Sequence, residues 1–235
     1  MVTRLTLCDL TASQFLGQLE TSLAIYADAM DADPSTLPGR RELMRRHAGY
    51  PAFRALQALI LPASSSDRQP ASSQPANSQP ANSQPASNDN SQPDSNAQVA
   101  GFAYGFHGQS GQWWFDAVWQ ALARTHGAGR AAVWLADSFE IAEVHVYQQF
   151  QRGGIGTAML LSLTGGRPER TAVLSTPDRD STARRLYRRM GFTELLTGYS
   201  FPGGSPPYIV MGAELPLRTS TGELARSPAA SPSIS

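Results

Sequence analysis

Along residues 1–61, hydrophobic and polar positions alternate with two different periods. Residues 2–7 alternate at every second position, which predicts a strand, and residues 55–61 form an apolar run that predicts another. Between them, residues 12–30 repeat apolar side chains at helical spacing, and residues 9–11 can cap that helix. A shorter helix is expected over residues 40–47. The N-terminal part therefore predicts a strand, two helices and a strand.

The pattern stops between residues 63 and 97, where a unit of Gln-Pro-Ala-Asn/Ser-Ser repeats. A proline at every fifth position removes helical hydrogen bonds and does not fit a central strand. The segment also has almost no apolar side chains to offset the entropy cost of ordering. We expect a disordered insertion that lengthens a hairpin loop, with a polyproline-type recognition segment as the alternative. The Ser-, Pro- and Ala-rich tail, residues 218–235, is expected to be disordered as well.

Beyond the insertion, strand patterns and helix patterns are interspersed. Strands are expected over residues 98–104, 139–147, 171–175, 192–196 and 208–212, and helices over residues 111–125, 131–137, 155–162 and from a cap at Asp180 or Ser181 to Met190. These elements predict a single α/β domain over residues 1–217, with a mixed sheet that carries the insertion in one of its hairpins.

Charge and cysteine content limit the class of protein. The 235 residues carry a formal net charge of zero at pH 7, which argues against a protein that covers phosphate backbones. The single cysteine makes no internal disulfide and no cysteine zinc site, and it indicates no oxidising compartment. The sequence shows neither a signal-peptide pattern nor a run of about 18 apolar residues. We expect a cytoplasmic protein that binds neither nucleic acid nor membranes and holds no metal.

All nineteen basic residues are arginine, so the chain has no lysine. A Walker-A phosphate loop needs its lysine, and so does a Schiff base with pyridoxal phosphate. Both classes of site are excluded.

Residues 151–156 read Gln-Arg-Gly-Gly-Ile-Gly and join a predicted strand to a predicted helix. The unpaired N–H groups and the dipole of a helix start attract phosphate, and glycines let the backbone approach it. Arg152 adds a positive charge at this turn. A dinucleotide fingerprint would need a third glycine where Met159 stands. The turn therefore predicts a pyrophosphate site that is not a dinucleotide site.

Two motifs follow one another around this turn. The first is Gln151-x-x-Gly154-x-Gly156-Thr157-Ala158, behind a strand that ends Val144-His145-Val146, and the second is Ala183-x-x-Leu186-Tyr187-x-x-x-Gly191-Phe192. Together they resemble the acetyl-CoA signatures of the GNAT superfamily of N-acetyltransferases. The resemblance covers roughly residues 2 to 215 apart from the insertion. It implies a GNAT-like α/β fold, with a mixed, mostly antiparallel sheet flanked by helices.

The resemblance also implies an enzyme that moves the acetyl group of acetyl-CoA, as co-substrate, to a primary amine by direct attack in a ternary complex. The acetyl-CoA contacts that it implies are Val144, His145, Val146, Gln151, Arg152, Gly153, Gly154, Ile155, Gly156, Thr157, Ala158 and Asp180. Asp180 stands where the family usually has asparagine. A small molecule or a peptide supplies the amine, and a homodimer is an option. The alternative function is a catalytically silent acyl-CoA-binding regulatory module.

Three groups are candidates for the chemistry. Glu143 and His145 share one face of a regular strand, and we interpret Glu143 as the general base, acting directly or through water. Glu140 is the reserve, on the other face. A carboxylate paired with an arginine is the structural alternative for Glu143, and ring packing is the alternative for His145. The resemblance makes Tyr187 the general acid and a backbone N–H near Val146 the oxyanion donor, although spacing alone would place Tyr187 in the core.

The segment 108–138 is longer than the family's usual connection. It contains Trp113, Trp114 and Trp119, which either line the acceptor pocket or pack the helix that carries them.

Overall fold

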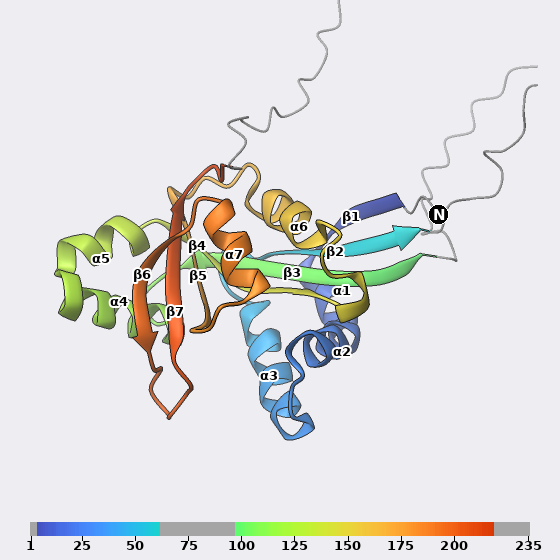
Figure 1. Ribbon diagram of the computed structural model, residues 1–235, viewed down its shortest axis with the longest axis horizontal. Helices are drawn as coiled ribbons and strands as arrows, with labels where there is room; N and C mark the ends of the chain where they lie inside the picture. Colours follow the sequence, from blue (N-terminus) through green and yellow to red (C-terminus); the bar gives the residue numbers. More distant parts are fainter. Residues whose placement is uncertain (1–3, 62–96, 219–235) are drawn as a thin grey trace, which may run out of the picture.

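Seven strands form one sheet in the computed structural model, which describes residues 4–61 and 97–218 (Figure 1). The strands are β1 (Arg4–Leu10), β2 (Arg54–Leu61), β3 (Gln98–Gly108), β4 (Ser138–Val146), β5 (Thr171–Pro177), β6 (Thr193–Tyr199) and β7 (Tyr208–Glu214). Their order is β1-β2-β3-β4-β5-β7-β6, and β4 with β5 is the parallel pair among antiparallel neighbours. The predicted mixed, mostly antiparallel sheet is confirmed.

Helices cover both faces of this sheet. They are α1 (Ala12–Gly17), α2 (Leu19–Met30), α3 (Leu37–His47), α4 (Trp113–His126), α5 (Ala128–Leu135), α6 (Ile155–Thr164) and α7 (Thr182–Arg189), with 3-10 turns η1 (Pro34–Thr36) and η3 (Gln148–Phe150). α6 and α7 pack on one face along β2–β5 and β7. The opposite face is divided, because α1–α3 cover β2–β4 and the pair α4–α5 covers β5–β7 (Figure 1). β4, which carries Glu143, is the middle strand of the sheet, and α7, which carries Tyr187, belongs to a cluster that includes residues of β4.

The N-terminal helical pattern folds as two helices instead of one. Thr11, which lies in the predicted cap segment, caps α1 through a capping box with Gln14. The chain leaves helical geometry at Gln18, after a glycine that is a weak helix former. The break lets Phe15 of α1 and Leu19 of α2 enter the same buried cluster. Periodicity alone does not reveal such a break, because both helices keep the same apolar spacing.

The predicted insertion lies almost entirely outside the described residues, and so does the tail beyond Arg218. The structure describes the strands on either side of the insertion, β2 and β3. β2 and β3 pair in antiparallel register from Arg54 opposite Gly105 to Ile60 opposite Gln98. The adjacent ends of two neighbouring antiparallel strands, β2 and β3, therefore flank the insertion.

The long connection between β3 and β4 forms the helical pair α4–α5. Trp114 donates from Nε1 to the Ser175 hydroxyl of β5 at 3.1 Å, and Trp119 stacks on Phe115 with ring centroids 5.8 Å apart. Trp113 stays 57% exposed. Trp114 thus joins α4 to β5, and Trp119 packs on another side chain of α4. Within residues 4–61 and 97–218, no helix has the length and apolar character needed to cross a bilayer.

Candidate active site

The glycine turn presents unpaired backbone N–H groups at the start of α6. Gly154 is the N-cap, with φ 80° and ψ −2°, and Arg152 also has a positive φ of 67°. The helix closes its first turn when Ala158 N donates to Gly154 O at 3.0 Å. The N–H groups of the three residues between them have no carbonyl partner within the helix. The turn therefore has the free donors that a pyrophosphate requires.

Two glycines of this turn are needed for different reasons. Gly154 has open space around its Cα, so the constraint is its left-handed backbone. Gly156 has ordinary helical geometry, but a Cβ there would lie 3.3 Å from Leu186 Cδ2 of α7. A small residue at Gly156 lets α7 approach α6. This contact joins the two sequence motifs in space.

β4 and β5 pair over a short distance and then diverge. The parallel ladder runs from Ser138 opposite Thr171 to Glu140 opposite Val173, whereas β4 continues to Val146. Tyr147 N donates to Ala100 O of β3 at 2.9 Å, so the backbone groups of Val146 point to the β5 side. The Val146 carbonyl accepts from Gln151 Nε2 at 3.0 Å, which leaves its N–H as a donor toward the diverging edge.

Glu143 and His145 share one face of β4, as predicted, and they contact each other. Glu143 is 6% exposed, and its Oε2 makes a short contact with His145 Nε2. Arg40 of α3 donates from Nη1 to Glu143 Oε1 at 2.7 Å and from Nη2 to the Tyr26 hydroxyl at 2.9 Å. The Tyr26 ring stands edge-on to the His145 ring, with centroids 5.2 Å apart. Three elements, α2, α3 and β4, therefore enclose the carboxylate.

The charge of Arg40 keeps Glu143 ionised. Burial alone raises the pKa of Glu143, but the guanidinium of Arg40 and the hydrogen bond from His145 outweigh it and lower the pKa below its usual value. The arginine pairing that the sequence left as an alternative is thus present. It makes Glu143 a carboxylate at neutral pH and reduces its strength as a base.

Glu140 lies on the same face of β4 as Glu143, so its predicted place on the opposite face is wrong. Glu140 is paired with Phe106 and Glu143 with Tyr104, and both aromatic rings belong to the cluster under α1–α3. The register shifts between Tyr104 and the next residue of β3, so that Ala142 is an extra residue in β4. Such a bulge reverses the alternation, and period-two reasoning does not detect it.

Glu140 has surroundings quite unlike those of Glu143. Its side chain is 4% exposed, and its Oε2 has no hydrogen-bond partner among the described residues. Burial raises the pKa of Glu140 to about 8. A carboxyl with that pKa is largely protonated at neutral pH and becomes a strong base once it ionises.

Tyr187 sits where α7 faces the core. It is 9% exposed, and its ring lies 5.7 Å from that of Phe192. Burial, and after it the charge of Glu143, raises the pKa of Tyr187 to about 12. The hydroxyl therefore stays protonated at neutral pH. The charge of Glu143 thus acts on Tyr187, although the two residues belong to different motifs.

The N-terminus of α7 resolves the predicted choice of cap. Ser181 is the N-cap, and its hydroxyl accepts from Arg184 N at 3.1 Å. Asp180 is exposed and pairs with Arg185 Nη1 at 2.7 Å. Two arginines of α7, Arg184 and Arg188, bind Glu194 of β6 at 2.8 and 2.6 Å.

Arg40 and Tyr26 are the site residues that sequence reasoning missed. Arg40 reads as one of several solvated arginines of a helix, and Tyr26 as an apolar position of another. No local pattern distinguishes them, since their role depends on how α2 and α3 cross β4.

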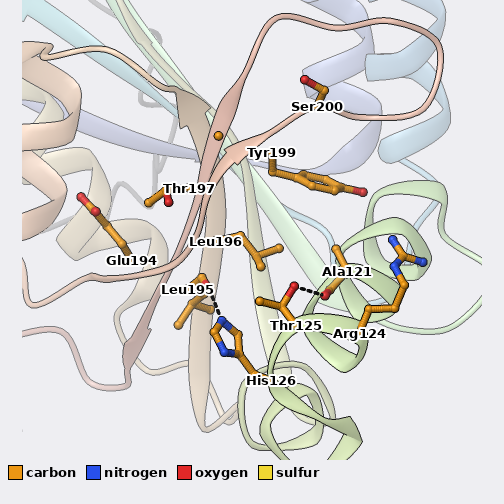
Figure 2. A pocket seen from close by; sticks show the side chains of 11 residues that line it. Ala121, Arg124, Thr125, His126, Glu194, Leu195, Leu196, Thr197, Tyr199 and Ser200 are labelled. Atoms are coloured by element: carbon orange, nitrogen blue, oxygen red, sulfur yellow. Dashed lines mark hydrogen bonds between the residues drawn. The ribbon is translucent and has the colours of Figure 1, made fainter.

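Two cavities lie on the side of the sheet covered by α4 and α5. One, of about 480 Å³, separates the C-terminal end of α4 from the edge strand β6, and Figure 2 shows Arg124 and Tyr199 at its wall. His126 Nε2 and the Leu195 carbonyl are 3.2 Å apart beside it. The second, of about 380 Å³, adjoins Trp134. Neither Glu143 nor Tyr187 lines them. No group of three or more potential metal-ligating side chains occurs within residues 4–61 and 97–218.

A known protein matches this chain almost end to end. A GCN5-like protein acetyltransferase of Mycobacterium tuberculosis is 32% identical over 216 residues, covering 90% of this chain and 98% of that protein. The chain belongs to the GNAT superfamily of acetyltransferases. This confirms the resemblance seen in the two motifs. No known family profile matches the chain.

Solved GNAT structures share the fold at low sequence identity. A putative acetyltransferase of the GNAT family from Desulfovibrio desulfuricans has a TM-score of 0.52 at 12% identity, covering 90% of this chain and 99% of that one. The ribosomal-protein-S18-alanine N-acetyltransferase of Escherichia coli has a TM-score of 0.51 at 14% identity, covering 94% and 100%. Arabidopsis thaliana NAA60, solved with a bisubstrate analogue, has a TM-score of 0.50 at 17%, covering 89% and 99%.

Proposed function

We propose that this GNAT acetyltransferase transfers the acetyl group of acetyl-CoA to a primary amine by direct attack within a ternary complex. The observation that carries the proposal is the convergence of three features at the diverging ends of β4 and β5. The N–H groups of the glycine turn begin α6, Glu143 lies on β4, and Tyr187 on α7 lies within electrostatic reach of Glu143.

The donor would be held mainly by backbone groups. The N–H groups at the start of α6 and the side chain of Arg152 suit the pyrophosphate. The free edge of β4 at Val144 and Val146 suits the amide groups of the pantetheine arm. The residues proposed to contact acetyl-CoA are Val144, His145, Val146, Gln151, Arg152, Gly153, Gly154, Ile155, Gly156, Thr157, Ala158 and Asp180. Because most of these contacts are backbone contacts, the turn geometry matters more than its side chains.

The acceptor must lose a proton before it attacks. An amine with a pKa of about 10.4 costs about 4.6 kcal/mol to deprotonate at pH 7. Glu143, directly or through water, takes this proton and passes it to solvent. The amine nitrogen then bonds to the thioester carbon, and the oxygen, now negative, accepts a hydrogen bond from a backbone N–H near Val146.

Collapse of this intermediate re-forms the carbonyl and breaks the carbon–sulfur bond. Tyr187 donates its proton to the departing thiolate, and the second proton of the attacking nitrogen restores the phenol. The products are the amide and the free thiol. A pKa of about 12 keeps Tyr187 protonated and ready to donate throughout the neutral range.

Glu140 is the second candidate for the base. Its pKa of about 8 is closer to the working pH than that of Glu143, and one of its oxygens has no partner in the described part of the chain. Both carboxyls lie on the face of β4 that α1–α3 cover. We keep Glu143 as the base and compare the two directly in the test below.

The acceptor class is a protein, peptide or small-molecule amine. Two similar proteins favour a protein amine. The mycobacterial relative is a protein acetyltransferase, and the Escherichia coli protein of the same fold is an N-acetyltransferase for an alanine of a ribosomal protein. The second candidate function is a silent acyl-CoA-binding module. The ion pair between Arg40 and Glu143 favours it, because a paired carboxylate also serves a purely structural role.

The test uses the full chain, calorimetry with acetyl-CoA, and thiol release over a panel of amines that includes peptide N-termini, lysine side chains and polyamines. We expect binding at tens of micromolar or tighter and turnover with at least one amine. Glu143→Gln and Glu140→Gln are compared, and loss of the base should lower kcat about 10²–10⁴-fold while acetyl-CoA still binds. Binding without turnover on any amine would support the silent module, and absence of binding would refute both.

A further inference from the structure

We propose that His145 takes the acceptor's proton at Nδ1, with Glu143 orienting its imidazole and Arg40 as a positioning residue for the pair. This inference rests on the proposed function and specifies how its base works. It assigns His145 a catalytic role, whereas the motif resemblance implied only a contact with acetyl-CoA.

Both oxygens of Glu143 are already engaged. Oε1 accepts from Arg40 Nη1 at 2.7 Å, and Oε2 is in short contact with His145 Nε2. The carboxylate is 6% exposed and lies beneath the α2–α3 pair. Each oxygen keeps a second acceptor site, but the carboxylate is buried, so His145, with an 11% exposed side chain, is the more accessible of the two to an ammonium group.

The ionisation of Glu143 determines the tautomer of His145. A carboxylate only accepts hydrogen bonds, so the proton of the neutral imidazole lies on Nε2. Nδ1 then carries the lone pair, and it makes no hydrogen bond within residues 4–61 and 97–218. A buried carboxylate that orients an imidazole in this way is a recurrent arrangement for activating a general base.

The rings around His145 hold its orientation. Tyr26 of α2 stands edge-on at 5.2 Å, with an interplanar angle of 84°, and Phe102 of β3 lies 5.6 Å away at 38°. A ring fixed on two sides keeps Nδ1 in one direction, so little reorganisation is needed when the amine arrives.

Arg40 is itself fixed, which makes it suited to positioning. Its guanidinium donates to the Tyr26 hydroxyl at 2.9 Å and lies 4.5 Å from the centroid of that ring. By holding Glu143 in the ionised form, Arg40 keeps the proton of His145 on Nε2 and prevents the carboxyl from retaining the proton itself.

The proton balance is simple. The ammonium of the acceptor gives one proton to Nδ1, which leaves a neutral amine and an imidazolium that is hydrogen-bonded to Glu143. The imidazolium releases the proton to solvent after the transfer. Besides Arg40 and Glu143, the titratable groups near this pair begin with Tyr26 of α2, whose ring contacts His145. The charge of Glu143 also acts on His47 of α3, Tyr104 of β3 and Tyr187 of α7, and Glu140 of β4 acts on Tyr104.

The experiment measures kcat, the KM for acetyl-CoA and the pH profile of full-length His145→Gln and His145→Ala. Gln can still donate to Glu143 but offers no base, and Ala leaves room for free imidazole. We expect kcat to fall about 10²–10⁴-fold in both, with a much smaller change in the KM for acetyl-CoA, loss of the acid limb of the profile, and partial recovery of His145→Ala by added imidazole.

Two results would overturn the relay. One is wild-type turnover in His145→Gln, which would show that Glu143 or Glu140 acts without it and would leave the proposed function intact. The other is a low rate that imidazole does not restore and whose profile keeps the wild-type acid limb, since that is a structural effect. Failure of the wild-type chain to bind acetyl-CoA is a different outcome, because it refutes the proposed function itself. Thermal unfolding of each variant is measured alongside, to separate a folding defect from loss of the base.

Discussion

Glu140 and Glu143 lie on the same face of β4 although they are three residues apart. On a regular strand these positions face opposite sides, but Ala142 is an extra residue at a bulge opposite Tyr104 and Gly105. The two buried carboxyls have opposite pKa shifts, since the counter-charge of Arg40 acts on Glu143, whereas burial alone determines the shift of Glu140. The first two predictions follow from this difference.

Glu140→Gln should stabilise the protein at pH 8 and above but not at pH 4. The folded pKa of about 8 exceeds the usual 4.5, so between these values the unfolded chain has released a proton that the folded chain still holds. The free energy of unfolding therefore falls as pH rises through this window, by up to about 5 kcal/mol. In Glu140→Gln this fall of the free energy of unfolding with pH should be absent. Chemical unfolding of both proteins from pH 4 to pH 9 measures it.

Glu42→Gln is the control for this experiment, because Glu42 is an exposed residue of α3. Its unfolding curve should follow that of the wild type at every pH. Parallel pH curves for wild type and Glu140→Gln would show that the pKa of Glu140 is not raised.

Arg40→Gln should destabilise the protein, and more at neutral than at acid pH. The lowered pKa of Glu143 means that its contribution to stability is present above the unfolded pKa and is lost as pH falls through the folded one. Without Arg40 the carboxylate stays buried beside a neutral partner, at a cost of about 2–4 kcal/mol at pH 7. The deficit should shrink as pH falls through the lowered folded pKa of Glu143, because the carboxyl is then protonated.

Arg41→Gln is the matched change on the next residue. Arg41 binds Glu20 at the surface at 2.7 Å, where solvent screens the pair, so stability should hardly change. An equal loss in both variants would mean that helix α3, and not the buried pair, is responsible.

Tyr187→Phe should lower kcat about 10²–10⁴-fold with little change in stability. The phenol provides the proton for the thiolate, whereas the ring alone fills the space beside Phe192. Thiol release under saturating acetyl-CoA measures the rate, and thermal unfolding checks the fold. Tyr199→Phe is the control, because the Tyr199 hydroxyl donates to Ala117 O on the α4 side of the molecule. Equal rates for Tyr187→Phe and wild type would remove the acid assignment.

Gly154→Ala should weaken acetyl-CoA binding up to about tenfold. An alanine has room there, but the left-handed backbone at φ 80° costs a side chain about 1–2 kcal/mol, and relaxation of the turn would rotate its N–H groups away from the ligand. Calorimetry measures the dissociation constant. Gly153→Ala, one residue earlier, should bind like the wild type, because its Cβ would make only an ordinary contact, 3.7 Å from Phe150 O. Equal affinity in all three proteins would indicate that the turn does not carry the pyrophosphate.

The sequence by itself determined the local features of this protein. Period-two and period-3.6 patterns located the strands and most helices, and the glycines of residues 151–156 identified a turn with free N–H groups. The motif around this turn and the second motif around Tyr187 and Phe192 carried the resemblance to the GNAT superfamily. These features depend on residues that are near in the chain, so one sequence contains them.

Tertiary structure alone decided how the catalytic candidates are paired. Arg40 comes from α3, far from Glu143 in sequence, and it reaches the carboxylate because α2 and α3 cross β4. The bulge at Ala142 depends on the register with β3, so alternation within β4 placed Glu140 on the wrong face. The ionisation state of each carboxyl depends on these contacts. A buried carboxyl is raised or lowered in pKa by the charges that the fold brings to it, and no spacing rule specifies them.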